Sequence, residues 1–191
     1  MSEPVILTAA TTALVMIDLQ KGILAQPLEP RPSEAVVEGA ETFALRCRAA
    51  GILVIWVHVG FGTDFVEAPP TNVDQPIPRP EGGLPSNYSD FAPGLQQPGD
   101  LAIFKRNWGA FYGTELDVVL RRRAVTTIML AGVATPFGVE STARQAWERN
   151  YDVVTLEDLC AAPNAVLHWN SIDNIFPRLS RVRQTGDVTF V

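Results

Sequence analysis

Apolar residues in this chain fall into short, nearly continuous runs, separated by longer segments with helical spacing. Such runs are typical of strands that are buried on both faces of a parallel sheet. We expect strands at residues 11–17, 52–59, 101–104, 125–131 and 151–156, with a weaker sixth at 187–191. Apolar positions recur with helical spacing over residues 33–50, 114–123, 139–149 and 163–176.

Strands and helices alternate along the whole chain, which predicts a parallel sheet with right-handed crossovers and helices on both faces. The length of 191 residues suits a single domain over 1–191. Neither of the glycine-rich phosphate-binding motifs, G-x-G-x-x-G and G-x-x-x-x-G-K-[ST], occurs in the sequence. The pattern therefore predicts a three-layer α/β fold and gives little support to nucleotide binding.

Residues 60–100 interrupt the alternation. Eight of the 15 prolines lie in this segment, and no periodicity is sustained through it. Because core elements follow it, we expect a long ordered loop rather than a linker between domains. We interpret this loop as a lid or an interface segment.

Composition narrows the classes of partner. The formal net charge is −6, without a basic stripe, which argues against nucleic acid or an anionic membrane as partner. No apolar run reaches the ~18 residues that a membrane span needs, and the N-terminus lacks the pattern of a signal peptide. Two cysteines are too few for a disulfide framework. We therefore expect a cytoplasmic protein with neither nucleic acid nor a membrane as partner.

Three candidate groups follow predicted strands. Asp18 follows the first strand, Lys105 the third, and the turn at 134–138 the fourth. Because open parallel sheets bind ligands at the carboxyl ends of their strands, we expect these groups to converge. A lysine beside a carboxylate would hold it ionised or share its proton, and free N–H groups in the turn would bind developing negative charge.

The turn itself reads as the start of a helix. Thr135 has the character of an N-cap, and Pro136 that of a first helical residue. Gly138 does not fit this pattern, since glycine in a first turn costs roughly 0.5–1 kcal/mol relative to alanine. We expect that something approaches this backbone closely, or that a side chain is unwanted there.

Other reactive side chains have simpler explanations. Cys47 lies on the apolar stripe of a predicted helix, and we interpret Cys160 as a packing residue. The hydroxyl of Thr142 suits a bond to its own helix better than a nucleophilic role. His58 and His168 belong to no metal-spaced cluster, so we expect neither a metal nor another cofactor.

Three motifs resemble the isochorismatase-like (cysteine hydrolase) superfamily. They are ALVMIDLQ at 13–20, KRNWGAFYGTEL at 105–116, and GVAT at 132–135 followed by VESTAR at 139–144. The resemblance implies a six-stranded parallel sheet, a catalytic pair of Asp18 and Lys105, a cis peptide between Val133 and Ala134, and a homodimer or homotetramer. Where amidases of this superfamily carry a nucleophilic cysteine, this chain has Gly138.

The missing cysteine places the chain in a glycine-bearing branch. True isochorismatases also have glycine there, and they hydrolyse a vinyl ether without a covalent intermediate. The resemblance thus implies an Asp18 that acts as general acid on isochorismate or a related compound, with Lys105 tuning it and Gly138 leaving room. Two alternatives stay open: a catalytically silent small-molecule-binding protein, and an amide hydrolase that uses water.

We also expect substrate contacts around this pair. Aromatic residues beside Lys105 and Gly138 favour a pocket wall, and the turn borders the same space. The expected substrate-binding residues are Gln20, Trp108, Phe111, Ala134, Thr135 and Phe137.

Overall fold

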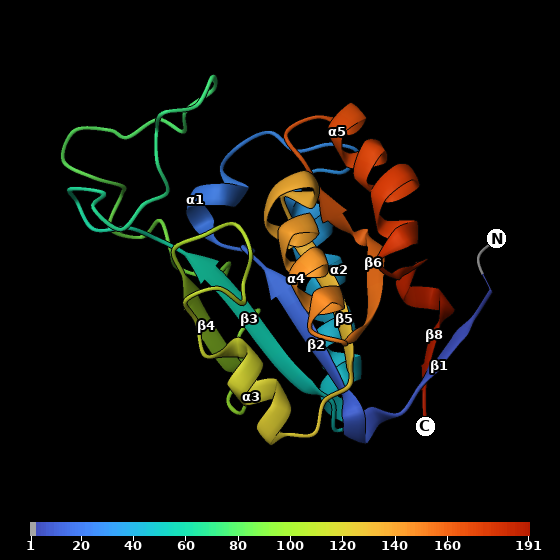
Figure 1. Cartoon of the computed structure of the whole chain (residues 1–191). Coiled ribbons are helices and arrows are strands. Elements are labelled where there is room, and N and C mark those ends of the chain that lie inside the picture. Colours follow the sequence, from blue (N-terminus) through green and yellow to red (C-terminus); the bar gives the residue numbers. More distant parts are fainter. Residues whose placement is uncertain (1–2) are drawn as a thin grey trace.

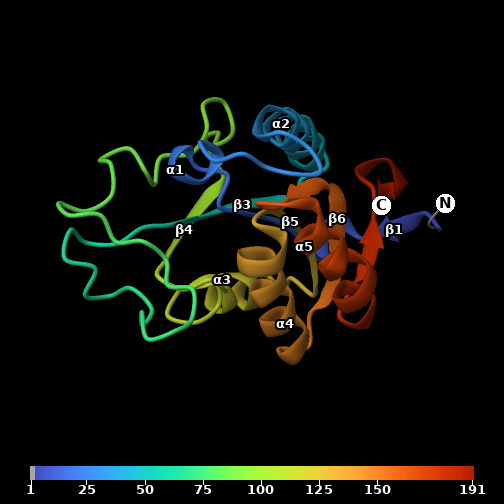
Figure 2. The ribbon, with the colours of Figure 1, turned by 90° about the horizontal axis from the view of Figure 1, so that it is seen from above.

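A computed structural model of the chain describes residues 3–191 as a three-layer α/β fold. Figure 2 shows helices α1 (Lys21–Leu24) and α2 (Ser33–Ala49) on one face of the sheet, with α3 (Leu116–Arg122) and α4 (Glu140–Glu148) on the other. The last helix, α5 (Ala165–Asn170), lies in the sequence after β6 (Asp152–Ala161). The fold class that the sequence predicts is confirmed.

The central sheet has six parallel strands in the order β4-β3-β2-β5-β6-β7. These strands are β2 (Thr12–Ile17), β3 (Leu53–Val59), β4 (Leu101–Lys105), β5 (Thr127–Val133), β6 (Asp152–Ala161) and β7 (Arg181–Arg183). Every residue of β2 and β5 is buried, because helices cover both faces of the sheet. The strand order reverses between β2 and β5, where ligands bind in open α/β sheets.

The strand predicted at 187–191 lies outside this sheet, which corrects that prediction. It is β8 (Val188–Phe190), and it pairs with β1 (Val5–Leu7) in a separate two-stranded sheet. Figure 1 shows this pair beside the main body, close to both ends of the chain. The sixth strand of the main sheet is β7, which contains two arginines and so lacks an apolar run.

Several helices begin or end differently from the sequence-based expectation. The segment predicted as one helix over 139–149 starts earlier, with a π-helical turn η2 (Thr135–Val139) that leads into α4. The segment predicted over 163–176 is α5, then a π-helical turn η3 (Ser171–Ile175), then a short 3-10 turn η4 (Phe176–Arg178). Two further 3-10 turns are η1 (Ala9–Thr11) and η5 (Thr185–Asp187).

Residues 60–100 form a loop without helix or strand, as the prolines predict. In Figure 1 it extends from the end of β3 away from the main body before it returns to β4. Within residues 3–191, no helix is both long enough and apolar enough to cross a membrane.

Gly132 is a position where the packing of β5 against β2 excludes a side chain. Its φ is +125°, and a Cβ atom there would lie 2.1 Å from the carbonyl oxygen of Ile17. We expect Gly132→Ala to lower the free energy of unfolding by more than about 3 kcal/mol, because backbone atoms of two buried strands would have to separate. Urea unfolding measures this loss.

A matched control for this substitution is Gly186→Ala. No atom lies within 4 Å of a Cβ at that position. We expect its free energy of unfolding to stay within about 0.5 kcal/mol of the wild type. Equal effects of the two substitutions would contradict the account of Gly132.

Candidate active site

A buried ion pair joins the ends of two strands of the sheet. Asp18 follows β2 directly, and Lys105 is the last residue of β4. Lys105 Nζ lies 2.8 Å from Asp18 Oδ2 and 3.0 Å from the carbonyl oxygen of Asn107. Asp18 is 5% exposed and Lys105 is 2% exposed. The convergence expected from the strand ends is therefore present, although Lys105 reaches Asp18 past the intervening strand β3.

Asp18 keeps one oxygen without a protein partner. Its Oδ1 is buried and accepts no hydrogen bond, while Oδ2 accepts from Lys105. Burial raises the pKa of Asp18 to about 6, against the charge and hydrogen bond of Lys105, which lower it. A carboxyl group in this state can take up or release a proton near neutral pH, and Oδ1 is the atom where the proton would sit.

The turn η2 brings Gly138 against this carboxyl group. A Cβ atom at position 138 would lie 3.1 Å from Asp18 Oδ2 and 2.8 Å from Ile17 Cγ2. The peptide bond between Val133 and Ala134, just before the turn, is cis. A side chain at position 138 would thus contact the ion pair directly, and glycine leaves that volume open.

The sequence-based account of the turn needs two corrections. Thr135 is not an N-cap: its hydroxyl donates to the carbonyl oxygen of Ala161, 3.0 Å away, and the residue is fully buried. Its expected contact with substrate stays a prediction. The N–H groups of Phe137 and Val139 are not free either, because both donate to the carbonyl oxygen of Ala134. These two amides therefore have no free donor for an anion.

An apolar cavity of about 520 Å³ lies under the 60–100 loop. Residues 61–88 supply most of its lining, and Asn107 and Trp108 complete it. Asp18 and Lys105 do not line it themselves. Their link to the cavity is this segment, since Lys105 donates to Asn107 and the Trp108 carbonyl oxygen would lie 3.5 Å from a Cβ at position 138.

Two of the aromatic residues that we expected to contact substrate, Trp108 and Phe137, lie against each other beside the turn. The rings of Trp108 and Phe137 lie 4.8 Å apart, and Trp108 is 49% exposed. Ala134 is half-buried at the start of η2. These three residues remain candidates for contact with substrate.

Gln20 and Phe111, two of the expected substrate contacts, have partners within the protein, and their contact with substrate stays a prediction. The Gln20 side chain is fully buried: Nε2 donates to the carbonyl oxygens of Val59 and Tyr88, and Oε1 accepts from Val59 N–H. Phe111 is also buried, and its ring packs against Tyr151. Gln20 therefore ties the loop to the sheet, and Phe111 belongs to the core.

Both cysteines are packing residues, as predicted. Burial raises the pKa of Cys47 and of Cys160 to about 12, so neither is a thiolate near neutral pH. Thr142 bonds back to the carbonyl oxygen of Gly138 at 2.7 Å, as expected of a hydroxyl within a helix. In residues 3–191, no three His, Cys, Asp or Glu side chains are grouped so that they could hold a metal ion.

Sequence reasoning missed Tyr88 and His168. Tyr88 lines the cavity, and burial raises its pKa, with the charge of Asp18 acting in the same direction. His168 is fully buried and its Nδ1 contacts the Thr135 hydroxyl at 2.9 Å. Tyr88 lies in a loop without periodicity, so no local pattern marks it, whereas the only signal at His168 was a histidine within a predicted helix.

The chain is similar in sequence to a known family and to known proteins. A family model for the isochorismatase domain matches residues 12–187. The uncharacterised isochorismatase family protein YecD of Escherichia coli O157:H7 is 46% identical over 95% of this chain and 96% of its own length. A ureidoacrylate amidohydrolase, RutB of Methylorubrum extorquens, is 30% identical over 82% of this chain and 72% of its own length.

Solved structures agree with the family match. An isochorismatase family protein from Burkholderia thailandensis superimposes with a TM-score of 0.91 and 42% identity, over 98% of this chain and 97% of that one. The fold described above is therefore shared along nearly the whole chain.

The raised pKa of Asp18 has a consequence for stability. The ordinary pKa of such a carboxyl group is 3.8, and burial raises it to about 6 in the folded protein. Between about pH 4 and pH 6 the folded protein holds a proton that the unfolded chain has released, so this group lowers the free energy of unfolding as the pH rises. Asparagine does not titrate, so Asp18→Asn lacks this loss. The unfolding free energy of Asp18→Asn minus that of the wild type should therefore rise by roughly 1–3 kcal/mol from pH 4 to pH 7.

Urea unfolding of both proteins at several pH values measures this difference. Asp90→Asn is the control, because Asp90 forms a surface pair with Lys21 and such pairs contribute little. A difference between Asp18→Asn and the wild type that stays constant from pH 4 to pH 7 would refute the raised pKa.

Proposed function

The chain belongs to the isochorismatase family, whose members are hydrolases, and we propose that it hydrolyses a vinyl ether by general-acid catalysis from Asp18. Isochorismate is the first candidate substrate. No covalent intermediate is required, so a chain without a cysteine at position 138 can carry out this reaction.

The observation that carries the proposal is the state of the Asp18 carboxyl group. It is buried beside a glycine, its Oδ1 has no partner, and its pKa is raised to about 6. A general acid works best when its pKa lies near the operating pH. Lys105 holds Oδ2 and leaves Oδ1 as the atom that can give a proton.

The reaction consumes one water molecule. Protonated Asp18 gives its proton to the methylene carbon of the vinyl ether, and the carbon–carbon double bond becomes an oxocarbenium ion. Water adds to the cationic carbon and returns a proton to the Asp18 carboxylate. The resulting hemiketal breaks its carbon–oxygen bond to the leaving alcohol, and a ketone is released. For isochorismate the ketone is pyruvate.

The cavity suits the non-reacting part of such a substrate. Its lining is mostly apolar and includes Trp108, whose ring lies 4.8 Å from that of Phe137 in the turn. Of the described residues that line it, Arg79 is the one with a charge. We assign Arg79 to a substrate carboxylate, because guanidinium groups bind carboxylates through paired hydrogen bonds.

A second candidate function is amide hydrolysis with water as nucleophile. It is favoured by the relatives named ureidoacrylate amidohydrolase. It is disfavoured because water must then replace the thiolate that usually attacks the amide: position 138 is a glycine, and both cysteines are buried. A third is binding without turnover, which the intact cavity also allows.

Pyruvate release from isochorismate tests the leading proposal. We expect turnover by the wild type and a loss of at least about 100-fold in Asp18→Asn, which removes the proton donor. We also expect kcat/KM to fall as the pH rises above about 6, because Asp18 then loses its proton.

Each other outcome has a defined meaning. No turnover by the wild type rules out isochorismate, and ureidoacrylate is then assayed in the same way. Equal turnover by the wild type and Asp18→Asn rules out the mechanism. Thermal stabilisation by a ligand that is never converted supports binding without catalysis.

A further inference from the structure

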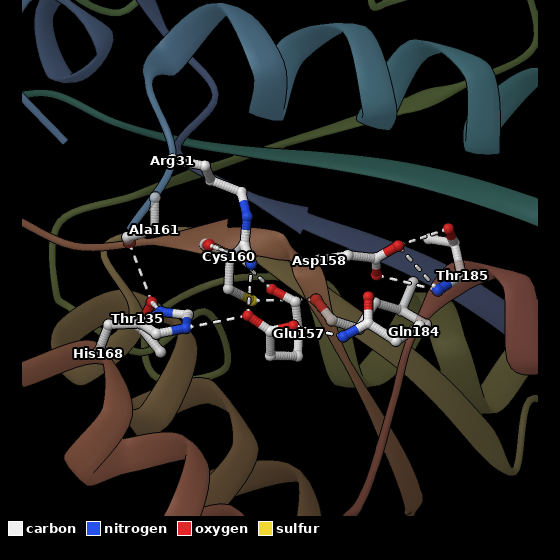
Figure 3. Close-up of polar contacts among 10 residues, drawn as sticks. Arg31, Thr135, Glu157, Asp158, Cys160, Ala161, His168, Gln184 and Thr185 are labelled. Atoms are coloured by element: carbon white, nitrogen blue, oxygen red, sulfur yellow. Dashed lines mark hydrogen bonds and ion pairs between the residues drawn. The ribbon is translucent and has the colours of Figure 1, made fainter. Parts of the chain in front are cut away.

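A chain of buried polar groups lies behind the turn η2 (Figure 3). The Thr135 hydroxyl oxygen lies 2.9 Å from His168 Nδ1 and 3.0 Å from the carbonyl oxygen of Ala161. On the other side of the ring, His168 Nε2 lies 3.1 Å from Glu157 Oε1. The chain thus runs from the first residue of η2, through α5, to strand β6.

Glu157 is anchored on both of its oxygens. Arg31 Nη2 lies 2.5 Å from Oε1, and Gln184 Nε2 donates to Oε2 at 2.6 Å. Arg31 also donates to the carbonyl oxygens of Glu157 and Cys160. Burial raises the pKa of Glu157, but hydrogen bonds from His168 and Arg31 outweigh it and lower the pKa to about 2. Glu157 is therefore a carboxylate.

Donor counting then restricts the ring of His168. A carboxylate only accepts, so Nε2 carries a hydrogen. The single hydrogen of the Thr135 hydroxyl serves either Ala161 or Nδ1. If the hydroxyl donates to Ala161, Nδ1 must carry a hydrogen and donate it to the Thr135 oxygen. If Nδ1 carries no hydrogen, the hydroxyl must donate to Nδ1 instead. In either state the ring and the hydroxyl hold each other.

We propose that His168, oriented by Glu157, is a positioning residue that fixes η2 through the Thr135 hydroxyl and thereby sets the distance between position 138 and Asp18. The turn meets the ion pair on its inner side, where a Cβ at position 138 would lie 3.1 Å from Asp18 Oδ2. Thr135, the first residue of the turn, is held by its contacts with Ala161 and His168. A small displacement at Thr135 therefore changes the space beside the reactive carboxyl group.

A thiol placed at position 138 can report a displacement of the turn without any substrate. In a Gly138→Cys background, the new Cβ lies 2.8 Å from Ile17 Cγ2 and 3.1 Å from Asp18 Oδ2, so both side chains shift by a few tenths of an ångström to admit it. The reactivity of that thiol depends on the nearby charges of Asp18 and Lys105. Its rate of alkylation by iodoacetamide across pH 5–9 therefore reports where the turn lies.

Two substitutions in this background break the chain at different points. Thr135→Val removes the hydroxyl, and His168→Phe removes both ring nitrogens. We expect each to change the alkylation rate at neutral pH by at least about threefold and to shift its pH profile. Thr135→Ser should keep the parent profile, because it keeps the hydroxyl.

Thr155→Val is the matched control. Thr155 is fully buried on the same strand as Glu157, and its hydroxyl bonds to Ser180 at 2.8 Å, outside the chain that reaches η2. We expect it to leave the profile unchanged. The proposal is overturned if Thr135→Val matches its parent, or if Thr155→Val shifts the profile as much.

Nitrogen-15 NMR of the histidine rings gives an independent measurement on the wild type. The chain has two histidines, so His58→Gln assigns the remaining signals to His168. We expect a hydrogen on Nε2, and an Nε2 without one overturns the proposal. Neither measurement uses turnover, so the result stands even if isochorismate proves not to be a substrate.

Discussion

The buried ion pair of Asp18 and Lys105 constrains the rest of the structure. Removing two charges from water costs several kcal/mol per ion, and only close contact offsets this cost. Contact at 2.8 Å requires that the ends of β2 and β4 lie at one edge of the sheet, with β3 between them. Burial keeps water away from the pair, and this loss of hydration raises the pKa of Asp18.

Much of this arrangement can be predicted from the sequence, because it follows from strand ends. A strand buried on both faces has no polar position until it ends, so Asp18 and Lys105 mark two ends clearly. The carboxyl ends of parallel strands share one edge, which predicts that the two meet. Gly138 is visible for a similar reason, since it breaks an otherwise regular helix start.

The remainder depends on distant partners that no local pattern encodes. The orientation of the Thr135 hydroxyl is decided by Ala161 and His168, which are 26 and 33 residues further along the chain. Thr before Pro is typical of an N-cap, so the local sequence favours the wrong answer. Strand β7 escapes prediction because it is three residues long and charged at both ends.

Gln20 has a consequence for the loop that follows β3. Its side chain ties Val59, where the loop leaves the sheet, to Tyr88, near where the loop returns. Since both stems are fastened to the residue that lies two positions after Asp18, the length and composition of the chain between them can vary without moving the ion pair. The loop that lines the cavity is thus separable from the ion pair, and its sequence can change while the geometry of the pair is kept.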